Sequence, residues 1–187
     1  MNLAGVDEVG RGALAGPVLA CATILPTDFN STLVIDSKKL SIKKREEAFN
    51  FLMKNVIDYG IGIVCPKIID KINIHRATKQ AMYIALNQLK QPYSLVVIDA
   101  LLLSKLDVKN ISINKAEDKY IQVAAASIIA KVTRDRLLDQ LDRLFPNYGF
   151  NKNKGYGTKK HIEALRKYGP SIVHRKTYLK KLSFNNL

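Results

Sequence analysis

Two adjacent carboxylates and a glycine-flanked arginine lie near the beginning of the chain. A short apolar run ends at Asp7 and Glu8, and the segment Gly10-Arg11-Gly12 follows almost at once. Adjacent acids at the end of a strand supply the oxygen ligands that a hard divalent cation requires. Glycines beside an arginine let both the backbone and the guanidinium approach a phosphate closely. Together these residue types indicate phosphodiester chemistry.

A third acid, Asp99, follows directly after an apolar run, Leu95-Val96-Val97-Ile98. Four consecutive apolar residues predict a buried central strand, and a carboxylate at its end is costly unless it is paired or bound to a metal ion. The simpler alternative is a turn acid that caps the following segment. Because ligands gather at the carboxyl ends of strands in α/β sheets, we expect Asp99 to lie near Asp7 and Glu8.

A fourth acid, Asp135, is the next step on an apolar stripe of a long predicted helix. The stripe advances by four, three and four residues through Ile121, Ala125, Ile128 and Val132. This spacing predicts that the Asp135 side chain projects from the core-facing side of the helix. The alternative is an ordinary ion pair with Lys131, one turn earlier, or with Arg136.

If the four acids Asp7, Glu8, Asp99 and Asp135 converge, they form an oxygen-only site. Such a site suits Mg²⁺ or Mn²⁺ and does not suit zinc. Two ions about 3.5–4 Å apart can activate a water molecule and stabilise the leaving 3′ oxygen of a phosphodiester. Carboxylates this close also raise one another's pKa until a metal ion binds.

The charge of the chain favours a polyanionic partner. The net charge is +14, and residues 101–187 hold 18 of the 30 lysines and arginines but 7 of the 16 acids. A basic surface of this kind attracts nucleic acid over long range. An anionic membrane is the alternative, but no basic amphipathic helix with exposed large apolar residues is evident. No apolar run is long enough to cross a bilayer and the start lacks a signal-peptide pattern, so we expect a cytoplasmic protein.

The apolar pattern predicts one α/β domain in 187 residues. Continuous apolar runs predict strands at residues 3–7, 17–25, 60–65, 94–98 and 111–113. Helical spacing and capping residues predict helices at residues 42–57, 73–90, 119–143 and 159–168. Strands first and helix–strand alternation afterwards indicate a mixed central β-sheet flanked by helices.

The segment Gly10-Arg11-Gly12-Ala13-Leu14-Ala15 also satisfies the spacing of a dinucleotide-binding turn. That motif must open a helix, whereas Gly16-Pro17 and a strand-like run follow here. The sequence therefore argues against a nucleotide-cofactor enzyme.

Six blocks in order make the chain resemble the ribonuclease HII family, the type 2 ribonucleases H. The blocks are residues 7–18 (DEVGRGALAGPV), 36–41 (DSKKLS), 73–82 (NIHRATKQAM), 124–136 (AAASIIAKVTRDR), 148–161 with Tyr148-Gly149-Phe150, Lys154-Gly155-Tyr156-Gly157-Thr158 and His161, and His174-Arg175. Each block alone is a weak signal, but their order over nearly the whole chain is specific.

The resemblance implies an RNase H-like fold with a helical, basic C-terminal extension. The expected division is a catalytic domain at residues 1–145 and an extension at residues 146–187 packed on the same domain. It implies an endonuclease that uses Mn²⁺ or Mg²⁺ to cut RNA in RNA–DNA hybrids and single ribonucleotides in duplex DNA. Cutting 5′ of the ribonucleotide would leave a 3′-hydroxyl and a 5′-phosphate and would serve to remove ribonucleotides from DNA. We expect a monomer with no membrane partner.

The same resemblance implies roles for individual residues. The catalytic, metal-binding acids would be Asp7, Glu8, Asp99 and Asp135. The segment Gly10-Arg11-Gly12 would read the 2′-hydroxyl and the flanking phosphate, and Tyr156 would stack at the RNA–DNA junction, as the chemistry of the 2′-hydroxyl and of aromatic platforms allows. Lys38 and Lys39 are expected to contact phosphate, with a solvated pair before a helix as the alternative.

Two positions depart from the family pattern. Ala100 replaces the glycine that usually follows the third acid, which adds a methyl group beside Asp99. The usual Lys-Gly-Asp before the long helix is replaced by Ala116-Glu117-Asp118, so we assign no role to Asp118. Ribonuclease HIII is the nearest rival family, but it carries an additional N-terminal substrate-binding domain. A nucleic-acid-binding protein without catalysis is disfavoured by the four acids.

Overall fold

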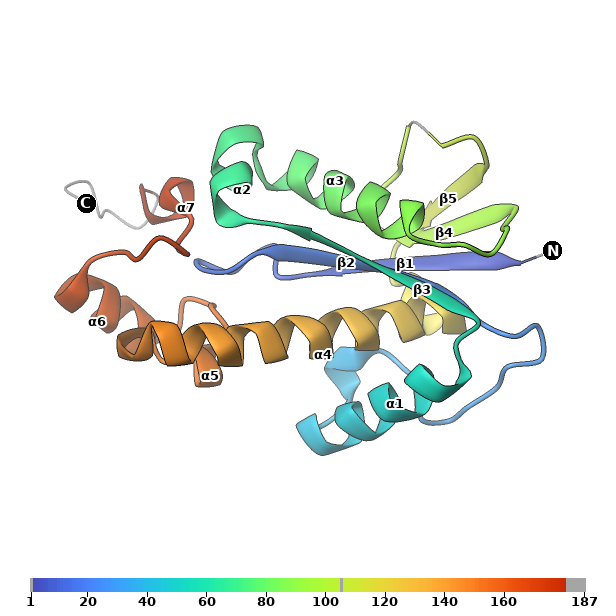
Figure 1. Ribbon diagram of the computed structural model, residues 1–187, viewed down its shortest axis with the longest axis horizontal. Coiled ribbons are helices and arrows are strands. Elements are labelled where there is room, and N and C mark those ends of the chain that lie inside the picture. The colour runs from blue at the N-terminus through green and yellow to red at the C-terminus, as the bar shows by residue number, and fades with distance from the viewer. Residues whose placement is uncertain (1, 105, 181–187) are drawn as a thin grey trace.

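A five-stranded mixed β-sheet forms the centre of the molecule in the computed structural model, which describes residues 2–104 and 106–180 (Figure 1). The strands are β1 (Leu3–Val9), β2 (Val18–Ile24), β3 (Asp58–Val64), β4 (Leu95–Asp99) and β5 (Lys109–Ile113). They lie in the order β3-β2-β1-β4-β5. The β1–β2 and β2–β3 pairs are antiparallel, whereas β4 is parallel to both β1 and β5. The expected mixed central sheet is confirmed.

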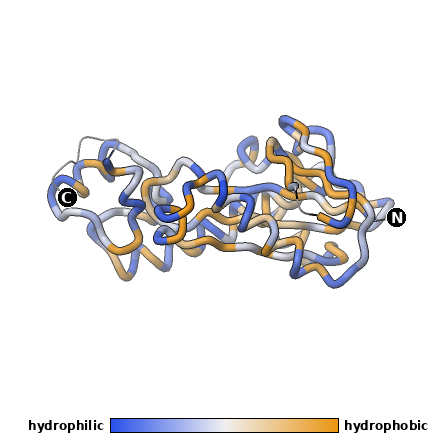
Figure 2. Tube along the Cα trace, turned by 90° about the horizontal axis from the view of Figure 1, so that it is seen from above, coloured by the Kyte–Doolittle hydropathy of each residue, from blue (hydrophilic) through white to orange (hydrophobic). Residues whose placement is uncertain are grey.

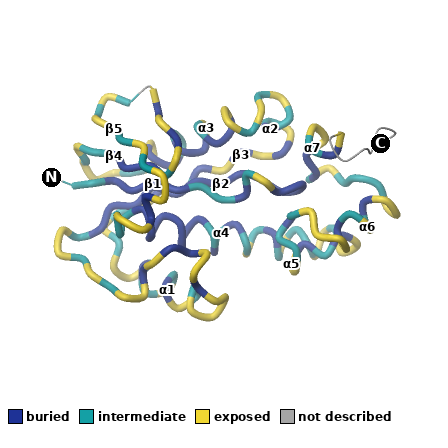
Figure 3. Tube along the Cα trace, turned by 180° about the vertical axis from the view of Figure 1, so that it is seen from behind, coloured by how far each residue is buried: buried dark blue, intermediate teal, exposed yellow. Residues whose placement is uncertain are grey.

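Helices cover both faces of the sheet (Figure 1). On one face lie α2 (Pro66–Ile72) and α3 (Ile74–Asn87), and on the other lie α1 (Ile42–Asn55) and the long α4 (Ile121–Leu144). All seven residues of β2 are buried because the strand lies between these two layers, which explains its continuous apolar sequence. Figure 3 shows that burial is greatest along β1, β2 and the adjoining part of α4.

Glycines in β3 allow α3 to pack unusually close to the sheet. A Cβ atom at Gly62 would lie 1.8 Å from the Ala81 carbonyl oxygen, and one at Gly60 would lie 2.1 Å from the Ala85 oxygen. Because the backbones of β3 and α3 cannot move apart far enough to admit a Cβ atom, only glycine fits at these two positions. The small residues of α3 and the glycines of β3 therefore form one complementary surface.

The outer edge of β3 is partly closed by a side chain of α3's C-terminal end. The Gln88 carboxamide accepts a hydrogen bond from the Ile61 N–H at 3.0 Å and donates one to the Ile61 carbonyl at 2.8 Å. It thus satisfies both backbone groups as a neighbouring strand would.

The C-terminal segments pack on the far end of α4 (Figure 1). They comprise a turn of 3₁₀ helix, η3 (Pro146–Tyr148), and the helices α5 (Phe150–Asn153), α6 (Lys159–Tyr168) and α7 (Lys176–Lys180). Their small core contains Phe150, Leu165 and Leu138 of α4. Asp70 of α2 accepts hydrogen bonds from the N–H groups of Lys176 and Thr177, which fixes the start of α7 against the sheet domain. Polar and apolar stretches alternate along these helices, as expected for amphipathic elements (Figure 2).

The predicted strands and the four predicted helices are all present, with ends shifted by a few residues. Helix α2 is an additional helix that the sequence pattern did not predict; Pro66 occupies its first turn, where the missing N–H costs nothing. Two further short elements position the site described below, η1 (Ser37–Lys39) and η2 (Ala116–Asp118). Within the described residues, no helix is both long and apolar enough to span a membrane.

Candidate active site

Asp7 and Asp99 lie beside each other at the ends of two parallel strands. The register of β1 and β4 pairs Val6 with Ile98, so the next residue of each strand is an aspartate. The apolar residues before them enter the core and fix both backbones at this edge. The expectation that Asp99 would approach Asp7 and Glu8 is therefore met by the topology of the sheet.

Asp7 is held in an environment that opposes its ionisation. Asp7 is 5% exposed. Burial raises the pKa of its carboxyl to about 8, and the charges of Glu8 and Asp99 contribute to this rise. The Ser127 side chain of α4 and the Glu8 N–H, 2.7 Å away, donate hydrogen bonds that offset part of this rise. A carboxylate in these surroundings is stabilised by any positive charge that is added beside it.

Glu8 is half-buried, and only one of its oxygens is paired. Burial raises the pKa of its carboxyl, the Arg11 guanidinium lowers it and the Asp99 charge raises it again. Oε1 accepts a hydrogen bond from Arg11 Nη1 at 3.3 Å. Oε2 is inaccessible to solvent and has no hydrogen-bond partner among the described residues. A buried carboxylate oxygen without a hydrogen-bond partner is expected at a site that binds a cation.

Glu117 is a further buried acid at the same edge, and sequence reasoning missed it. It belongs to η2, is 8% exposed, and its Oε2 also lacks a partner within the described chain. The preceding residue connects η2 to the strand end, because the Ala116 N–H donates to Asp99 Oδ1 at 3.2 Å. When Lys115 is aligned with the lysine of the family's Lys-Gly-Asp pattern, Glu117 occupies the position of the aspartate. The sequence pattern placed Asp118 at that position, one residue too late.

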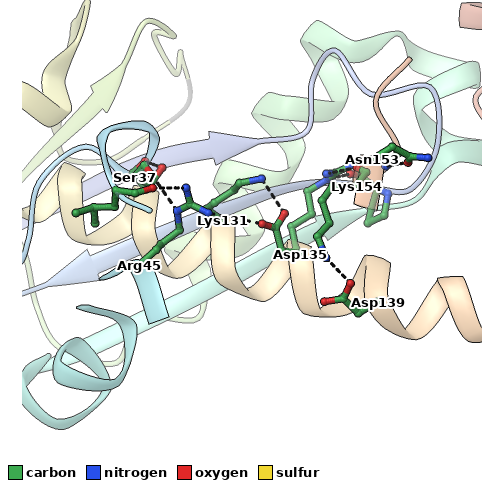
Figure 4. A network of polar contacts seen from close by, with 12 residues as sticks. Ser37, Arg45, Lys131, Asp135, Asp139, Asn153 and Lys154 are labelled. Atoms are coloured by element: carbon green, nitrogen blue, oxygen red, sulfur yellow. Dashed lines mark hydrogen bonds and ion pairs between the residues drawn. The ribbon is translucent and has the colours of Figure 1, made fainter. Parts of the chain in front are cut away.

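The structure does not place Asp135 beside the other acids, which corrects the prediction that all four acids converge. Asp7 interacts with Ser127, and Asp135 lies eight residues further along α4, a distance of about 12 Å at about 1.5 Å per residue. Its carboxylate accepts a hydrogen bond from Lys131 at 2.8 Å and lies 3.9 Å from Arg45 of α1 (Figure 4). The ion pair with Lys131 was the alternative that the sequence left open.

The stripe on α4 misled because this helix is buried on most of its circumference. Every residue from Val123 to Ala130 is buried, since α4 lies between the sheet and α1. A buried position on α4 therefore does not specify which neighbour the side chain meets. Asp135 faces the start of α1, and the separate ion pair between Lys154 and Asp139 lines the same pocket (Figure 4).

Lys38 and Lys39 face the acids across a short gap between η1 and η2. The Lys38 ammonium lies 3.7 Å from Glu117 Oε1, and Lys39 forms an ion pair with Asp118. Burial lowers the pKa of Lys38, but the charges of Asp7, Asp36 and Glu117 raise it above its usual value. Arg45 donates to the carbonyls of Ser37 and Leu40 and fixes this loop. Both lysine side chains are largely exposed, at 75% and 55%, so they form a solvated pair that also contacts the acids of η2.

The residues at the strand ends fit a divalent cation in chemistry and charge. Asp7, Glu8, Asp99 and Glu117 supply oxygen donors only. Two of these oxygens are buried without a partner among the described residues, and burial and neighbouring acids raise the pKa values of Asp7 and Glu8. As the side chains stand, no three acids, histidines or cysteines of the described residues are gathered tightly enough to enclose an ion. Binding would therefore draw the carboxylates together. The described histidines do not join this cluster. His161 and His174 are buried against each other in the C-terminal core, with their Nε2 atoms 3.0 Å apart.

The turn of residues 10–17 lies next to the acids and has a fixed shape. Gly10 and Gly16 adopt positive φ angles of 90° and 79°, which favour glycine. The Arg11 side chain is 40% exposed and Gly12 is exposed, so this part of the turn faces solvent. Tyr156 is half-buried on the segment that packs against the turn, because Gly155 O accepts hydrogen bonds from the N–H groups of Leu14 and Ala15. The structure brings together the turn and Tyr156, as expected.

Sequence and fold comparisons agree with this arrangement. A family model described as Ribonuclease HII matches residues 4–187. A protein named ribonuclease HII from Bacillus subtilis (strain 168) is 50% identical over 182 residues, which cover 97% of this chain and 71% of the relative. Another, from Caldanaerobacter subterraneus subsp. tengcongensis, is 48% identical over 180 residues, 96% of this chain and 75% of its own. The crystal structure of ribonuclease H2 from Pyrococcus horikoshii OT3 matches with a TM-score of 0.82 and 30% identity over 97% of each chain.

Proposed function

Because the chain belongs to the ribonuclease HII family of ribonuclease H endonucleases, we propose that it cuts the RNA strand of RNA–DNA hybrids and single ribonucleotides embedded in duplex DNA. The proposed cut is 5′ of the ribonucleotide and leaves a 3′-hydroxyl and a 5′-phosphate. Its role would be the removal of ribonucleotides from DNA. The observation that carries the proposal is a partly buried, electrostatically strained acid cluster directly beside a Gly-Arg-Gly turn that is open to solvent at Arg11 and Gly12.

The acid cluster would hold Mg²⁺ or Mn²⁺ through Asp7, Glu8, Asp99 and Glu117. A divalent ion there would supply Lewis acidity toward the scissile phosphate and the attacking water. Asp7 and Asp99 are rigid because their strands are buried, and the Ala116 N–H orients the Asp99 carboxylate. We leave Asp135 out of this set because it lies two turns further along α4, where Lys131 and Arg45 neutralise it.

The Gly-Arg-Gly turn would distinguish RNA from DNA. The amides of Arg11 and Gly12 have no hydrogen-bond acceptor within the part of the chain described, so they are free to meet a 2′-hydroxyl or a phosphate oxygen. Gly12 has no heavy atom within 4 Å of its would-be Cβ position, so a duplex can approach its backbone. Tyr156 would stack on the sugar or base at the junction.

Basic residues outside the acid cluster would hold the duplex backbone. Lys38 and Lys39 would exchange their acidic partners for phosphates, and the extension of residues 146–187 would add sequence-independent affinity. All of these groups come from one chain, which supports a monomeric enzyme.

One assay tests the proposal. The purified protein is incubated with Mg²⁺ or Mn²⁺ and a labelled DNA duplex that contains a single ribonucleotide, beside a uniform RNA–DNA hybrid and an all-DNA duplex. We expect cleavage of the first two substrates only, a 3′-hydroxyl on the upstream fragment and no cleavage by the Asp99→Asn variant. Cleavage of the all-DNA duplex, or full activity of the variant, would contradict the proposal.

A further inference from the structure

Two arginines, Arg134 and Arg175, are completely buried although neither has an acidic partner. Both residues are 0% exposed, and neither forms an ion pair within the described residues. A buried guanidinium without a carboxylate is costly, and burial accordingly lowers the pKa of both groups. Such a cost calls for a specific structural reason.

Backbone carbonyls of the 10–17 turn replace the missing carboxylates. Arg175 donates to the carbonyl oxygens of Gly10 at 2.7 Å, Arg11 at 2.8 Å and Gly16 at 2.9 and 3.1 Å. Arg134 donates to those of Ala15 at 3.2 Å and Pro17 at 3.0 Å. Five carbonyls of one short turn therefore point inward at two fixed cations.

This inward orientation of the carbonyls determines what the turn presents outward. With the Gly10 and Arg11 carbonyls directed at Arg175, the amides of Arg11 and Gly12 are left without an internal acceptor among the described residues. Successive free amides form a concave donor surface for an anionic or hydroxyl oxygen. Arg175 thus orients the donors of the turn without contacting the ligand, and Arg134 fixes the far end of the same turn.

Arg134 also connects the turn to the aromatic platform. It donates to the Lys154 carbonyl at 2.9 Å, and its guanidinium carbon lies 5.4 Å from the centre of the Tyr156 ring. A Cβ atom at Gly10 would lie 2.2 Å from Arg134 Nε, so the side chain packs directly behind the turn. A single planar group therefore sets the spacing between the donors of the turn and the platform.

We propose that Arg134 and Arg175 are positioning residues that set the selectivity for a ribonucleotide at an RNA–DNA junction, by fixing the turn of residues 10–17 relative to Tyr156. The proposal rests on the function proposed above. Only a forked guanidinium reaches several carbonyls at once; a lysine at either position keeps the charge but makes one point contact. A small shift between the two reading elements would weaken recognition of the junction more than that of a uniform hybrid.

The test compares Arg134→Lys and Arg175→Lys with the wild type on two substrates. The readout is kcat/KM for a single-ribonucleotide duplex divided by kcat/KM for a uniform hybrid, measured below the unfolding transition of each protein. We expect this ratio to fall by about tenfold or more, the size typical of misplaced substrate-positioning groups, while Mn²⁺ affinity measured by calorimetry is unchanged. The matched control is Leu86→Ala, which destabilises the α3 core and should leave the ratio as it is.

The outcomes separate this inference from the proposed function. A wild type that cleaves neither substrate would defeat the proposed function and this inference with it. A selective wild type and folded lysine variants with an unchanged ratio would overturn this inference alone.

If a lysine variant does not fold, hydrogen exchange of the wild type decides. The amides of Leu14, Ala15 and Gly16 donate to carbonyls of the C-terminal segments. They should exchange only through global unfolding if the two arginines fix the turn. Rapid exchange through local opening would overturn the inference.

Discussion

The acid cluster and the arginine-held turn are neighbours with opposite electrostatic designs. At the ends of β1 and β4, burial and neighbouring acids raise the pKa values of Asp7 and Glu8, and two carboxylate oxygens have no partner among the described residues. Behind the turn, two buried cations have their donors distributed over backbone carbonyls. The first region is incomplete without a cation, whereas the second is complete by itself.

This difference separates two uses of buried charge. An unsatisfied charge lowers stability and increases affinity for a counter-ion, which is useful where a ligand must bind. A satisfied charge adds rigidity, which is useful where a surface must keep one shape. Substitutions in the acid cluster should therefore lower activity more than stability, whereas substitutions of the buried arginines should lower stability strongly.

The largest expected effect concerns the membership of the acid cluster. Glu117→Gln should reduce cleavage by about 10²–10³-fold, the scale of losing one preorganised electrostatic group. Asp135→Asn should reduce it by about tenfold or less, because it removes a partly exposed ion pair worth about 1 kcal/mol or less. Steady-state rates at saturating Mg²⁺ measure both. Equal losses would place Asp135 functionally with the other acids.

The next prediction compares stability in the two regions. Arg175→Met should lower the free energy of unfolding by about 3–5 kcal/mol, because it leaves carbonyls of the turn buried without donors. Asp99→Asn should not lower it in the absence of divalent ions, because it removes one of several repelling charges. Urea denaturation with EDTA present gives both values. A destabilised Asp99→Asn protein would show that the cluster is not strained.

Two glycines of the turn offer a matched pair. Gly12→Ala should leave the free energy of unfolding within about 0.5 kcal/mol, since its methyl group enters open space. It should nevertheless reduce cleavage, because that methyl group lies where a duplex must approach. Gly10→Ala should cost about 1–3 kcal/mol, because φ is 90° and the methyl group would meet Arg134. Thermal unfolding and initial rates distinguish the pair.

The final comparison concerns opposite slopes in the dependence of stability on pH. Asp7 has a folded-state pKa of about 8 against an ordinary 3.8, so the folded state binds the extra proton and stability falls as pH rises between these values. Burial and then the neighbouring His161 lower the pKa of His174 from 6.5 to about 4, so stability falls as pH drops through that range. Denaturation without divalent ions should show a slope near neutral pH that Asp7→Asn removes and a slope in acid that His174→Gln reduces. Unchanged slopes would refute these assignments.

The sequence predicted the sheet and the Asp7–Asp99 pair because both follow from apolar runs that end in acids. It did not identify Glu117, because a short 3₁₀ turn, and no periodic element, brings that side chain to the strand ends. It misplaced Asp135 because an apolar stripe specifies a side of α4 but not the neighbour met at each turn. Ser127 reaches Asp7, whereas Asp135, two turns later, meets Lys131 and Arg45. The roles of Arg134 and Arg175 were invisible because backbone carbonyls, which every residue carries, are their partners.

The Gln88 carboxamide at the edge of β3 has a consequence for the protein in concentrated solution. An exposed edge strand can recruit a strand from another molecule, and repeated recruitment produces aggregates. Gln88 occupies both backbone groups of Ile61 in the middle of that edge, so an incoming strand would have to displace it first. Its replacement by alanine would leave the chemistry of cleavage intact and shorten the time for which the enzyme can be stored.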